Sequence, residues 1–182
     1  MFDDEAVLAA LRSAQRLGFV GARPVEQVID HARRLVAAVS EVSGSVADIG
    51  AGGGVPGFVL IRDRPDLDVT LIDRRSKRTD FLELVVRRHD LGERVEVLSR
   101  DVESVIEEVV RGERAAFDAV VARGFGPPDV TLSVMSRLAR PGAVLALTDP
   151  PAGDRWTSEL LAGLPVSREP SPVGVARFRR LS

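Results

Sequence analysis

The feature that most constrains the fold is an alternation of short β-branched runs with helical stretches through the middle of the chain. Each run is rich in Val, Ile and Leu, as expected of a buried strand, and a segment long enough for a helix separates it from the next. The runs lie at 46–49, 69–73, 95–98, 117–121 and 143–147. This alternation predicts an α/β fold, in which a mostly parallel sheet is covered by helices on both faces.

Further elements flank the alternation. Two amphipathic helices, the second opening at Pro24, are predicted to fill residues 1–45. Ser76 is expected to cap the helix after the second strand. Other helices are predicted at about 57–63, 102–110, 129–139 and 156–161, and late strands near 166 and at 175–178. We therefore predict a seven-stranded sheet in a single domain over 1–182, made of a helical extension and a core over 46–182.

Composition narrows the class of protein. The 182 residues carry 25 Lys+Arg and 27 Asp+Glu, a net charge of −2, so any RNA contact must come from a local basic patch. The absence of cysteine excludes disulfides and a thiolate nucleophile, and the separated His31 and His89 argue against a metal site. No apolar run approaches the roughly 20 residues of a membrane span. We expect a cytoplasmic protein with no membrane partner.

A glycine-rich turn follows the first strand. Residues 48–57 read Asp-Ile-Gly-Ala-Gly-Gly-Gly-Val-Pro-Gly. Glycine accepts a positive φ and lets the backbone approach a ligand, and open α/β sheets bind ligands at this edge. Amides near the start of the following helix are also expected to favour a carboxylate or a phosphate.

Three interpretations of this turn stay open on the residues alone. Residues 52–57 match the G-x-G-x-x-G dinucleotide fingerprint. Asp48 and the position of Gly50 favour S-adenosylmethionine (SAM), and Pro56 stands where a dinucleotide helix needs free amides. A purely structural turn is the third. Asp73, which ends the second strand, supports a nucleoside ligand because its carboxylate can accept hydrogen bonds from both ribose hydroxyls.

With these residues in view, the chain resembles the small-subunit ribosomal RNA guanine-N7 methyltransferase family, also called glucose-inhibited division protein B. The turn reproduces the family's D-[IV]-G-x-G-x-G-[LF]-P-G pattern, with Val55 in the apolar slot. Residues 69–82 and 117–123 are similar to its T-L-[IL]-D-S-x-x-K-[RK]-x-x-F-L and F-D-x-[VI]-x-[ST]-R-A patterns. The resemblance covers 46–147 and implies a Rossmann-like class I SAM-dependent methyltransferase fold.

The turn and the resemblance together indicate where a cofactor would bind. We expect SAM to contact Asp48, Gly50, Gly52, Val55, Asp73, Asp101, Val102 and Arg123. By resemblance, Asp101 and Val102 lie where the chain passes the adenine. Arg123 is also the expected substrate-binding residue, because a guanidinium at this edge can clamp a carboxylate or an RNA phosphate.

The activity implied by the resemblance is transfer of a methyl group from SAM to guanine N7 of small-subunit ribosomal RNA. The implied partner is ribosomal RNA or a ribosomal particle. The N7 lone pair is free, so no general base is required. Alternatives are a divergent SAM-dependent methyltransferase with a small-molecule or other RNA acceptor, a nicotinamide-dependent oxidoreductase, and a non-catalytic nucleotide-binding module.

The departures from the family fall on the acceptor side. Thr148 and Asp149 stand where the family has Lys-Gly, so an acid replaces a cation at the expected RNA-facing edge. Residues 149–152, Asp-Pro-Pro-Ala, resemble the [DNS]-P-P-[YFW] motif but lack its aromatic residue and follow the fifth strand, so we expect a rigid loop. His89 is expected to be packed, and His31 to lie opposite its helix's apolar stripe.

Overall fold

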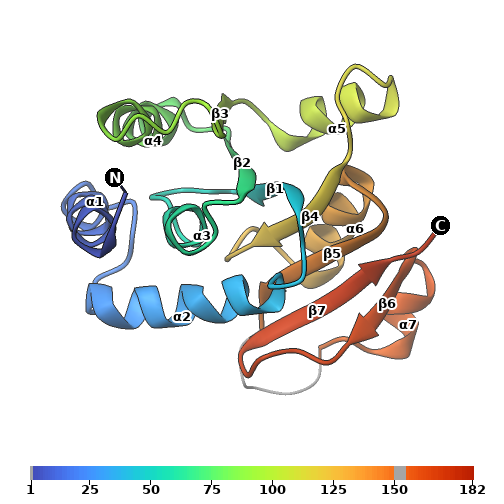
Figure 1. Cartoon of the computed structure of the whole chain (residues 1–182). Coiled ribbons are helices and arrows are strands. Elements are labelled where there is room, and N and C mark those ends of the chain that lie inside the picture. The colour runs from blue at the N-terminus through green and yellow to red at the C-terminus, as the bar shows by residue number, and fades with distance from the viewer. Residues whose placement is uncertain (1, 150–154) are drawn as a thin grey trace.

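Seven strands form one sheet in the order β3-β2-β1-β4-β5-β7-β6 in the computed structural model, which describes residues 2–149 and 155–182 (Figure 1). β1 to β5 run parallel, and β7 is antiparallel to both β5 and β6. The predicted seven-stranded α/β sheet is confirmed. The strands are β1 Gly44–Ile49, β2 Leu67–Asp73, β3 Val95–Ser99, β4 Phe117–Ala122, β5 Ala139–Thr148, β6 Val166–Glu169 and β7 Val175–Arg180.

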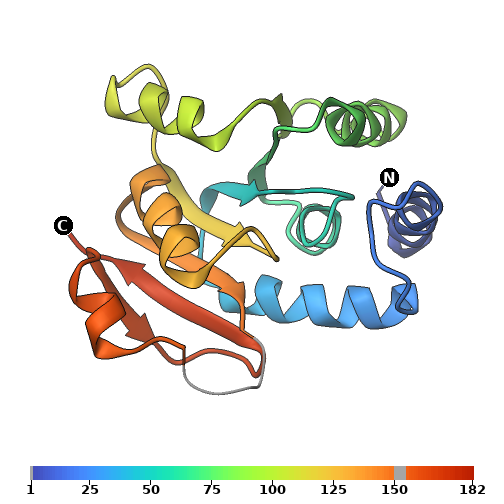
Figure 2. The same ribbon diagram turned by 180° about the vertical axis from the view of Figure 1, so that it is seen from behind.

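Helices cover both faces of the sheet, as predicted. One face carries α1 to α4 and the other α5 to α7, which appear on opposite sides of the molecule in Figures 1 and 2. Each face has its own apolar core, built around Phe58 and Leu35 on the first and around Phe178 and Ile106 on the second. The helices are α1 Asp4–Arg16, α2 Val25–Ala38, α3 Gly57–Asp63, α4 Ser76–Arg88, α5 Val102–Val110, α6 Pro128–Leu138 and α7 Ser158–Ala162.

Two local predictions were wrong. Ser76 does not cap α4, because the Asp73 carboxylate accepts the Arg75 N–H (2.9 Å) and the helix is already under way at Ser76. β5 begins at Ala139 rather than 143, because Ala139 pairs with Phe117 before the register shifts.

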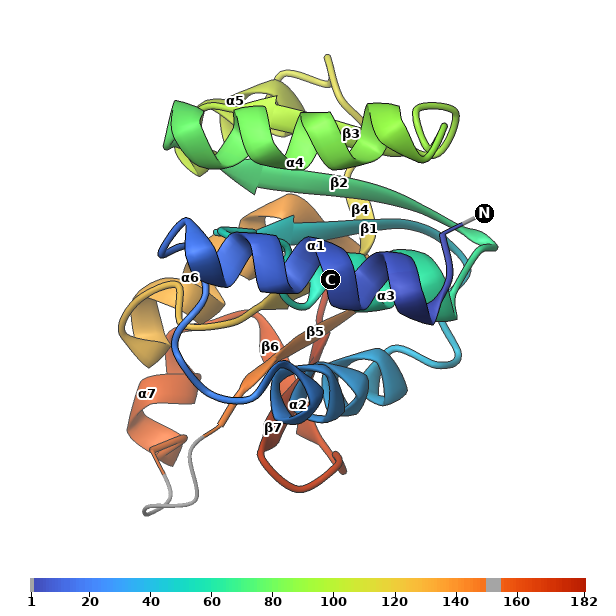
Figure 3. The same ribbon diagram turned by 90° about the vertical axis from the view of Figure 1, so that its left-hand side faces the viewer.

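The carboxyl ends of three strands meet beside the glycine-rich turn. β1 lies between β2 and β4, and Ile49 is opposite both Ile72 and Ala122. Figure 3 shows β1 and β2 ending on the same side of the molecule. Residues that follow these strands are therefore neighbours in space. Within the described ranges, no helix combines the length and the apolar character needed to cross a bilayer.

Candidate functional site

Backbone hydrogen bonds hold the glycine-rich turn against its neighbours. The N–H groups of Gly50 and Ala51 donate to the Ile72 carbonyl of β2, at 2.8 and 3.0 Å. Farther along, the Gly57 N–H donates to Oδ2 of the fully buried Asp48 at 2.9 Å. The Asp48 carboxylate thus ties the start of α3 back to the end of β1.

Glycine is required at particular places in this turn. Gly54 has φ +88°, and a Cβ there would lie 2.3 Å from the ring of Phe58. A Cβ on Gly57 would lie 2.5 Å from Cδ2 of Leu71 and 2.8 Å from Oδ2 of Asp48. Packing therefore excludes a side chain at both positions, whether or not a ligand binds.

The first two amides of α3 are not free for a ligand, contrary to the expectation from their position. The Gly57 N–H is bonded to Asp48, and the Phe58 N–H donates to the Gly54 carbonyl at 2.8 Å. Both groups are buried within the chain's own structure. A dinucleotide pyrophosphate needs such amides, so this arrangement weighs against the nicotinamide interpretation.

Burial makes Asp48 an unusual acid. It raises the pKa of this carboxyl to about 7, against the opposing effects of the Gly57 hydrogen bond and the Arg123 charge, and Asp73 adds a further rise. Its Oδ1 is buried and has no hydrogen-bond partner among the described residues. The carboxyl therefore changes charge near neutral pH, next to the half-buried guanidinium of Arg123.

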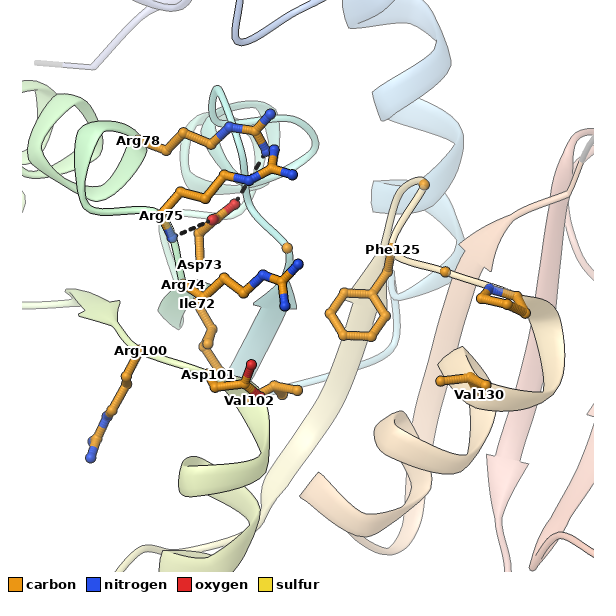
Figure 4. A pocket seen from close by; sticks show the side chains of 14 residues that line it. Ile72, Asp73, Arg74, Arg75, Arg78, Arg100, Asp101, Val102, Phe125 and Val130 are labelled. Atoms are coloured by element: carbon orange, nitrogen blue, oxygen red, sulfur yellow. Dashed lines mark hydrogen bonds and ion pairs between the residues drawn. The ribbon is translucent and has the colours of Figure 1, made fainter.

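A cavity of about 460 Å³ opens beside the turn (Figure 4). Its walls include the predicted cofactor residues Gly50, Asp73, Asp101 and Val102. The volume lies in the range of small-molecule sites. The predicted residues from the ends of β1, β2 and β3 are thus brought together in one place.

Asp73 is arranged to accept hydrogen bonds. It is only 6% exposed, and its Oδ2 accepts the Gly52 N–H at 2.9 Å while its Oδ1 accepts the Arg75 N–H at 2.9 Å. Nη1 of Arg78 lies 3.6 Å from Oδ2. Each carboxylate oxygen can accept a second hydrogen bond. The pair of oxygens therefore fits two adjacent hydroxyls, such as those of a ribose.

The end of the cavity away from Asp73 is lined by apolar side chains, which would suit a flat ring. Val102, the buried first residue of α5, follows Asp101, whose side chain accepts the Glu103 N–H at 3.1 Å. Phe125 projects its ring into the cavity from the loop after β4 (Figure 4), and a Cβ on Gly50 would lie 2.9 Å from it. Phe125 was not among the residues predicted from the sequence, although an aromatic residue two positions after Arg123 was a usable signal.

The remaining predicted cofactor residues do not line this cavity. Val55 and Asp48 are buried within the turn, and Gly52 acts through its amide on Asp73. Arg123 belongs instead to a basic group on the other side of the turn, which we call the acceptor-side group and which comprises Arg23, His31, Arg34 and Arg123.

The charges of the acceptor-side group affect the pKa values of its own members. Burial lowers the pKa of His31, and the charges of Arg123, Arg34 and Arg23 lower it further. Burial also lowers the pKa of Arg123, with Asp48 opposing and Arg23 reinforcing that shift. At neutral pH His31 is therefore a neutral imidazole among guanidinium groups.

A long-range contact positions this group. Arg34 of α2 donates from Nη1 to the Val173 carbonyl at 3.2 Å, across 139 residues of sequence. A Cβ on Gly174, which has φ +81°, would lie 3.3 Å from the same Nη1 and 3.7 Å from Cε1 of His31. The loop before β7 therefore packs directly on α2, which no local pattern predicts.

Asp149, the acid next to the position of the family's lysine, is itself paired. Oδ1 of Asp149 lies 3.2 Å from Nε of Arg155. The backbone N–H of Asp149 donates to the Gly174 carbonyl at 2.9 Å. Residues 150–152 of the Asp-Pro-Pro-Ala stretch lie outside the described residues. His89 packs edge-on against Phe2, with ring centroids 5.1 Å apart, as expected of a packed histidine.

Comparison with protein families matches residues 11–152 to the family described as rRNA small subunit methyltransferase G. A protein named Ribosomal RNA small subunit methyltransferase G from Salinispora tropica is 35% identical over 131 residues, which are 70% of this chain and 54% of that protein. The protein of the same name from a Nocardioides species is 38% identical over 134 residues, which are 71% of this chain and 51% of that protein. The chain spans about half the length of these relatives.

Solved structures share the fold at low sequence identity. A cofactor-bound protein from MTB superposes with a TM-score of 0.63 and 20% sequence identity. The match covers 98% of this chain and 90% of that protein's chain. A predicted O-methyltransferase from Agrobacterium tumefaciens has a TM-score of 0.61 and 20% identity, covering 83% and 81%. These likenesses concern the fold alone, and they agree with the predicted Rossmann-like class I methyltransferase fold.

Proposed function

This chain belongs to the rRNA small subunit methyltransferase G family, and from that premise we propose that it is a SAM-dependent methyltransferase acting on guanine N7 of small-subunit ribosomal RNA. The observation that carries the proposal is the Asp73 carboxylate. It is buried, held by the Gly52 and Arg75 amides, and faces a cavity beside the glycine-rich turn. Such an acceptor suits the ribose of an adenosine cofactor.

The residues around the cavity fit SAM. Asp73 would hold the ribose hydroxyls and Gly50 would form the floor under the cofactor, while the Gly52 amide would hold the Asp73 carboxylate in place. Asp101 and Val102 would border the adenine, opposite Phe125. The bound cofactor would supply an electrophilic methyl group carried on a sulfonium.

Buried residues would support that site from behind. Asp48 holds the turn to α3 through the Gly57 amide, and Val55 fills the space beneath. A cationic cofactor would favour the ionised form of Asp48, because opposite charges lower the pKa of a carboxyl. Arg123, coupled to Asp48, would connect the cofactor side to the acceptor-side group.

The acceptor-side group would hold the RNA. Arg123 and Arg34 present guanidinium forks suited to phosphate, and neutral His31 can accept a hydrogen bond from a base. Guanine N7 has a free lone pair, so the residues need only align it with the methyl group. Alignment of two reactants is worth roughly 7–11 kcal/mol of the barrier.

Asp149 favours a second candidate, a SAM-dependent methyltransferase of this family with a different acceptor. The family's Lys-Gly would place a cation where Thr148 stands, next to Asp149. Since Arg155 pairs with Asp149 at 3.2 Å, the local charge is balanced rather than negative, and an RNA acceptor remains our first choice, alone or within a ribosomal particle.

Two measurements test the proposal. Calorimetry with SAM and with NAD should show binding of SAM only; binding of NAD without SAM would overturn the cofactor assignment. Mapping of N7-methylguanine in ribosomal RNA should then show one mark that is lost from a strain lacking this protein and restored by the purified protein with SAM. Persistence of every such mark would leave the second candidate.

A further inference from the structure

Arginines in this molecule are paired very unevenly. Away from the carboxyl edge of the sheet they meet carboxylates, as Arg64 meets Asp66, Arg114 meets Glu96 and Arg137 meets Glu103. Such pairs cancel charge locally, so these surfaces attract a polyanion weakly. This pattern agrees with the net charge of −2.

The end of β2 is different. Arg74 and Arg75 follow Asp73 directly and are exposed, and no carboxylate of the described residues forms an ion pair with either guanidinium. Arg78 lies near them, and its only described ion pair is the 3.6 Å approach to Asp73. We call Arg74, Arg75 and Arg78 the β2 arginines. Among the described residues, the buried Asp73 is thus the one carboxylate paired with these three guanidinium groups, and it pairs with Arg78 alone.

Figure 4 shows how these side chains are directed. The β2 arginines gather around Asp73 at one end of the cavity, whereas Arg100 points away from them. Arg100 is satisfied elsewhere, because both its terminal nitrogens bond to Glu108. Positive charge is therefore concentrated at the end of the cavity where Asp73 lies.

A second cationic group lies across the turn. Ile72 of β2 and Ala122 of β4 are both opposite Ile49, so Arg74 and Arg123 follow strands separated by two strand spacings, about 10 Å. The acceptor-side group and the β2 arginines thus border the same turn from two sides. A ligand crossing the turn would meet guanidinium groups at both ends.

The proposed cofactor does not account for the β2 arginines. The nucleoside end of SAM carries no anion, and its sulfonium is positive, so three cations there would disfavour it. Guanidinium forks match phosphate oxygens. An RNA base reaches an enclosed site when it is unpaired and turned out of its strand, so the phosphates on either side of it would cross the cavity mouth.

We propose that the β2 arginines bind backbone phosphates of a single-stranded RNA segment that crosses the carboxyl edge of the sheet toward the acceptor-side group. This inference rests on RNA being the acceptor. The main alternative occupant is an adenosine nucleotide with a phosphate on its ribose, which the same cations would favour within the cavity.

RNA binding without methyl transfer tests the inference. We would measure the affinity of a fluorescent uridine homopolymer over a series of salt concentrations, with S-adenosylhomocysteine saturating the protein. The test variant is Arg74→Ala/Arg75→Ala. The matched control is Arg111→Ala/Arg137→Ala, which removes two exposed arginines that pair with glutamates elsewhere. Thermal unfolding confirms that both variants fold.

The test variant should lose two phosphate contacts. The slope of log affinity against log salt should fall in magnitude by about 1.4, and affinity should drop roughly 10- to 30-fold at about 0.1 M salt. The control should change affinity less than about twofold. Arg74→Lys/Arg75→Lys should keep most of the slope, because the charges remain.

Two results would overturn the inference. One is an unchanged slope in Arg74→Ala/Arg75→Ala. The other concerns adenosine 3′,5′-bisphosphate. If this nucleotide competes with SAM for the wild type but not for Arg74→Ala/Arg75→Ala, and the variant binds RNA as tightly as the wild type, the arginines bind a nucleotide. Since a uridine homopolymer contains no guanine, these outcomes are independent of whether the protein methylates guanine N7.

Discussion

The two sides of the glycine-rich turn are built in different ways. The cofactor side, formed by the ends of β1, β2 and β3, is held by bonds that span only 9 and 21 residues of sequence, from Gly57 to Asp48 and from Gly52 to Asp73. The acceptor side depends on α2 meeting the loop before β7, across 139 residues. A short motif is sufficient for the first, whereas the second requires the completed fold. The cofactor side should therefore respond sharply to single substitutions.

The largest effect is expected from Gly54→Ala. The substitution places a Cβ 2.3 Å from the Phe58 ring at a residue with φ +88°. Strain and overpacking together should lower the free energy of unfolding by roughly 2–6 kcal/mol. Urea denaturation measures this loss, and SAM binding should disappear with it.

Gly112→Ala is the matched control for that substitution. Gly112 also has a positive φ, +71°, but a Cβ there meets nothing within 4 Å. Only backbone strain remains, about 1–2 kcal/mol. If the two variants lose the same stability, the turn is not the tightly packed structure described above.

The next effect concerns Asp48, which lies between the two sides. Its pKa is about 7 in the folded chain against an ordinary 3.8. Between pH 3.8 and pH 7 the folded chain therefore keeps a proton on Asp48 that the unfolded chain has released. This stabilising contribution is complete below about pH 3.8 and is lost as the pH rises through 7. The loss is at most about 4 kcal/mol.

Asp48→Asn removes this titration and keeps an oxygen for the Gly57 amide. The free energy of unfolding of the variant, minus that of the wild type, should therefore increase from about pH 5 to about pH 7 and level off above it. Other titrating groups cancel in the difference. Parallel stability curves for the two proteins would show that burial does not raise this pKa.

Asp73→Ala should weaken SAM binding. The proposed hydrogen bonds from two ribose hydroxyls to a charged group are worth roughly 1.5–3 kcal/mol, which is about a 10- to 150-fold loss of affinity. Calorimetry measures it directly. Asp68→Ala, an exposed acid on the same strand, is the control and should leave affinity unchanged. An unchanged dissociation constant in Asp73→Ala would remove this residue from the site.

The same contrast explains what could be predicted from the sequence. The alternating strands, the turn and Asp73 were predictable because hydrophobic periodicity and a contiguous glycine pattern report on local structure. Arg34 was not, because its partner is the Val173 carbonyl and carbonyls carry no sequence signal. Arg74 was not predictable either, because the fold decides which carboxylates come near an arginine, and only the structure shows that no described carboxylate pairs with it.

Free amides at the start of α3 were also predicted wrongly, for a physical reason. A helix start normally leaves amides open to a ligand, but here Asp48 and the Gly54 carbonyl take them. Asp48 had been assigned to the cofactor, and its observed bonds are to the turn itself. An acid at the end of the preceding strand can thus accept the helix's amide hydrogen bond, so that this amide is no longer available to the anion that the sequence suggests.

The smallest effect on binding is expected on the acceptor side, from Asp149→Asn. This change removes an acid and leaves the Arg155 guanidinium, 3.2 Å away, without its counter-charge. Both atoms that face each other in this ion pair are buried, so the loss of the counter-charge should lower the free energy of unfolding by roughly 1–3 kcal/mol. RNA affinity should rise about two- to fivefold at low salt, because a repulsive charge is lost and a cation is released. Glu113→Gln, which removes one of the two carboxylates paired with Arg111 far from the carboxyl edge, should leave RNA affinity unchanged. A fall in affinity for Asp149→Asn would mean that Asp149 contacts the acceptor itself, which would favour the methyltransferase with a different substrate.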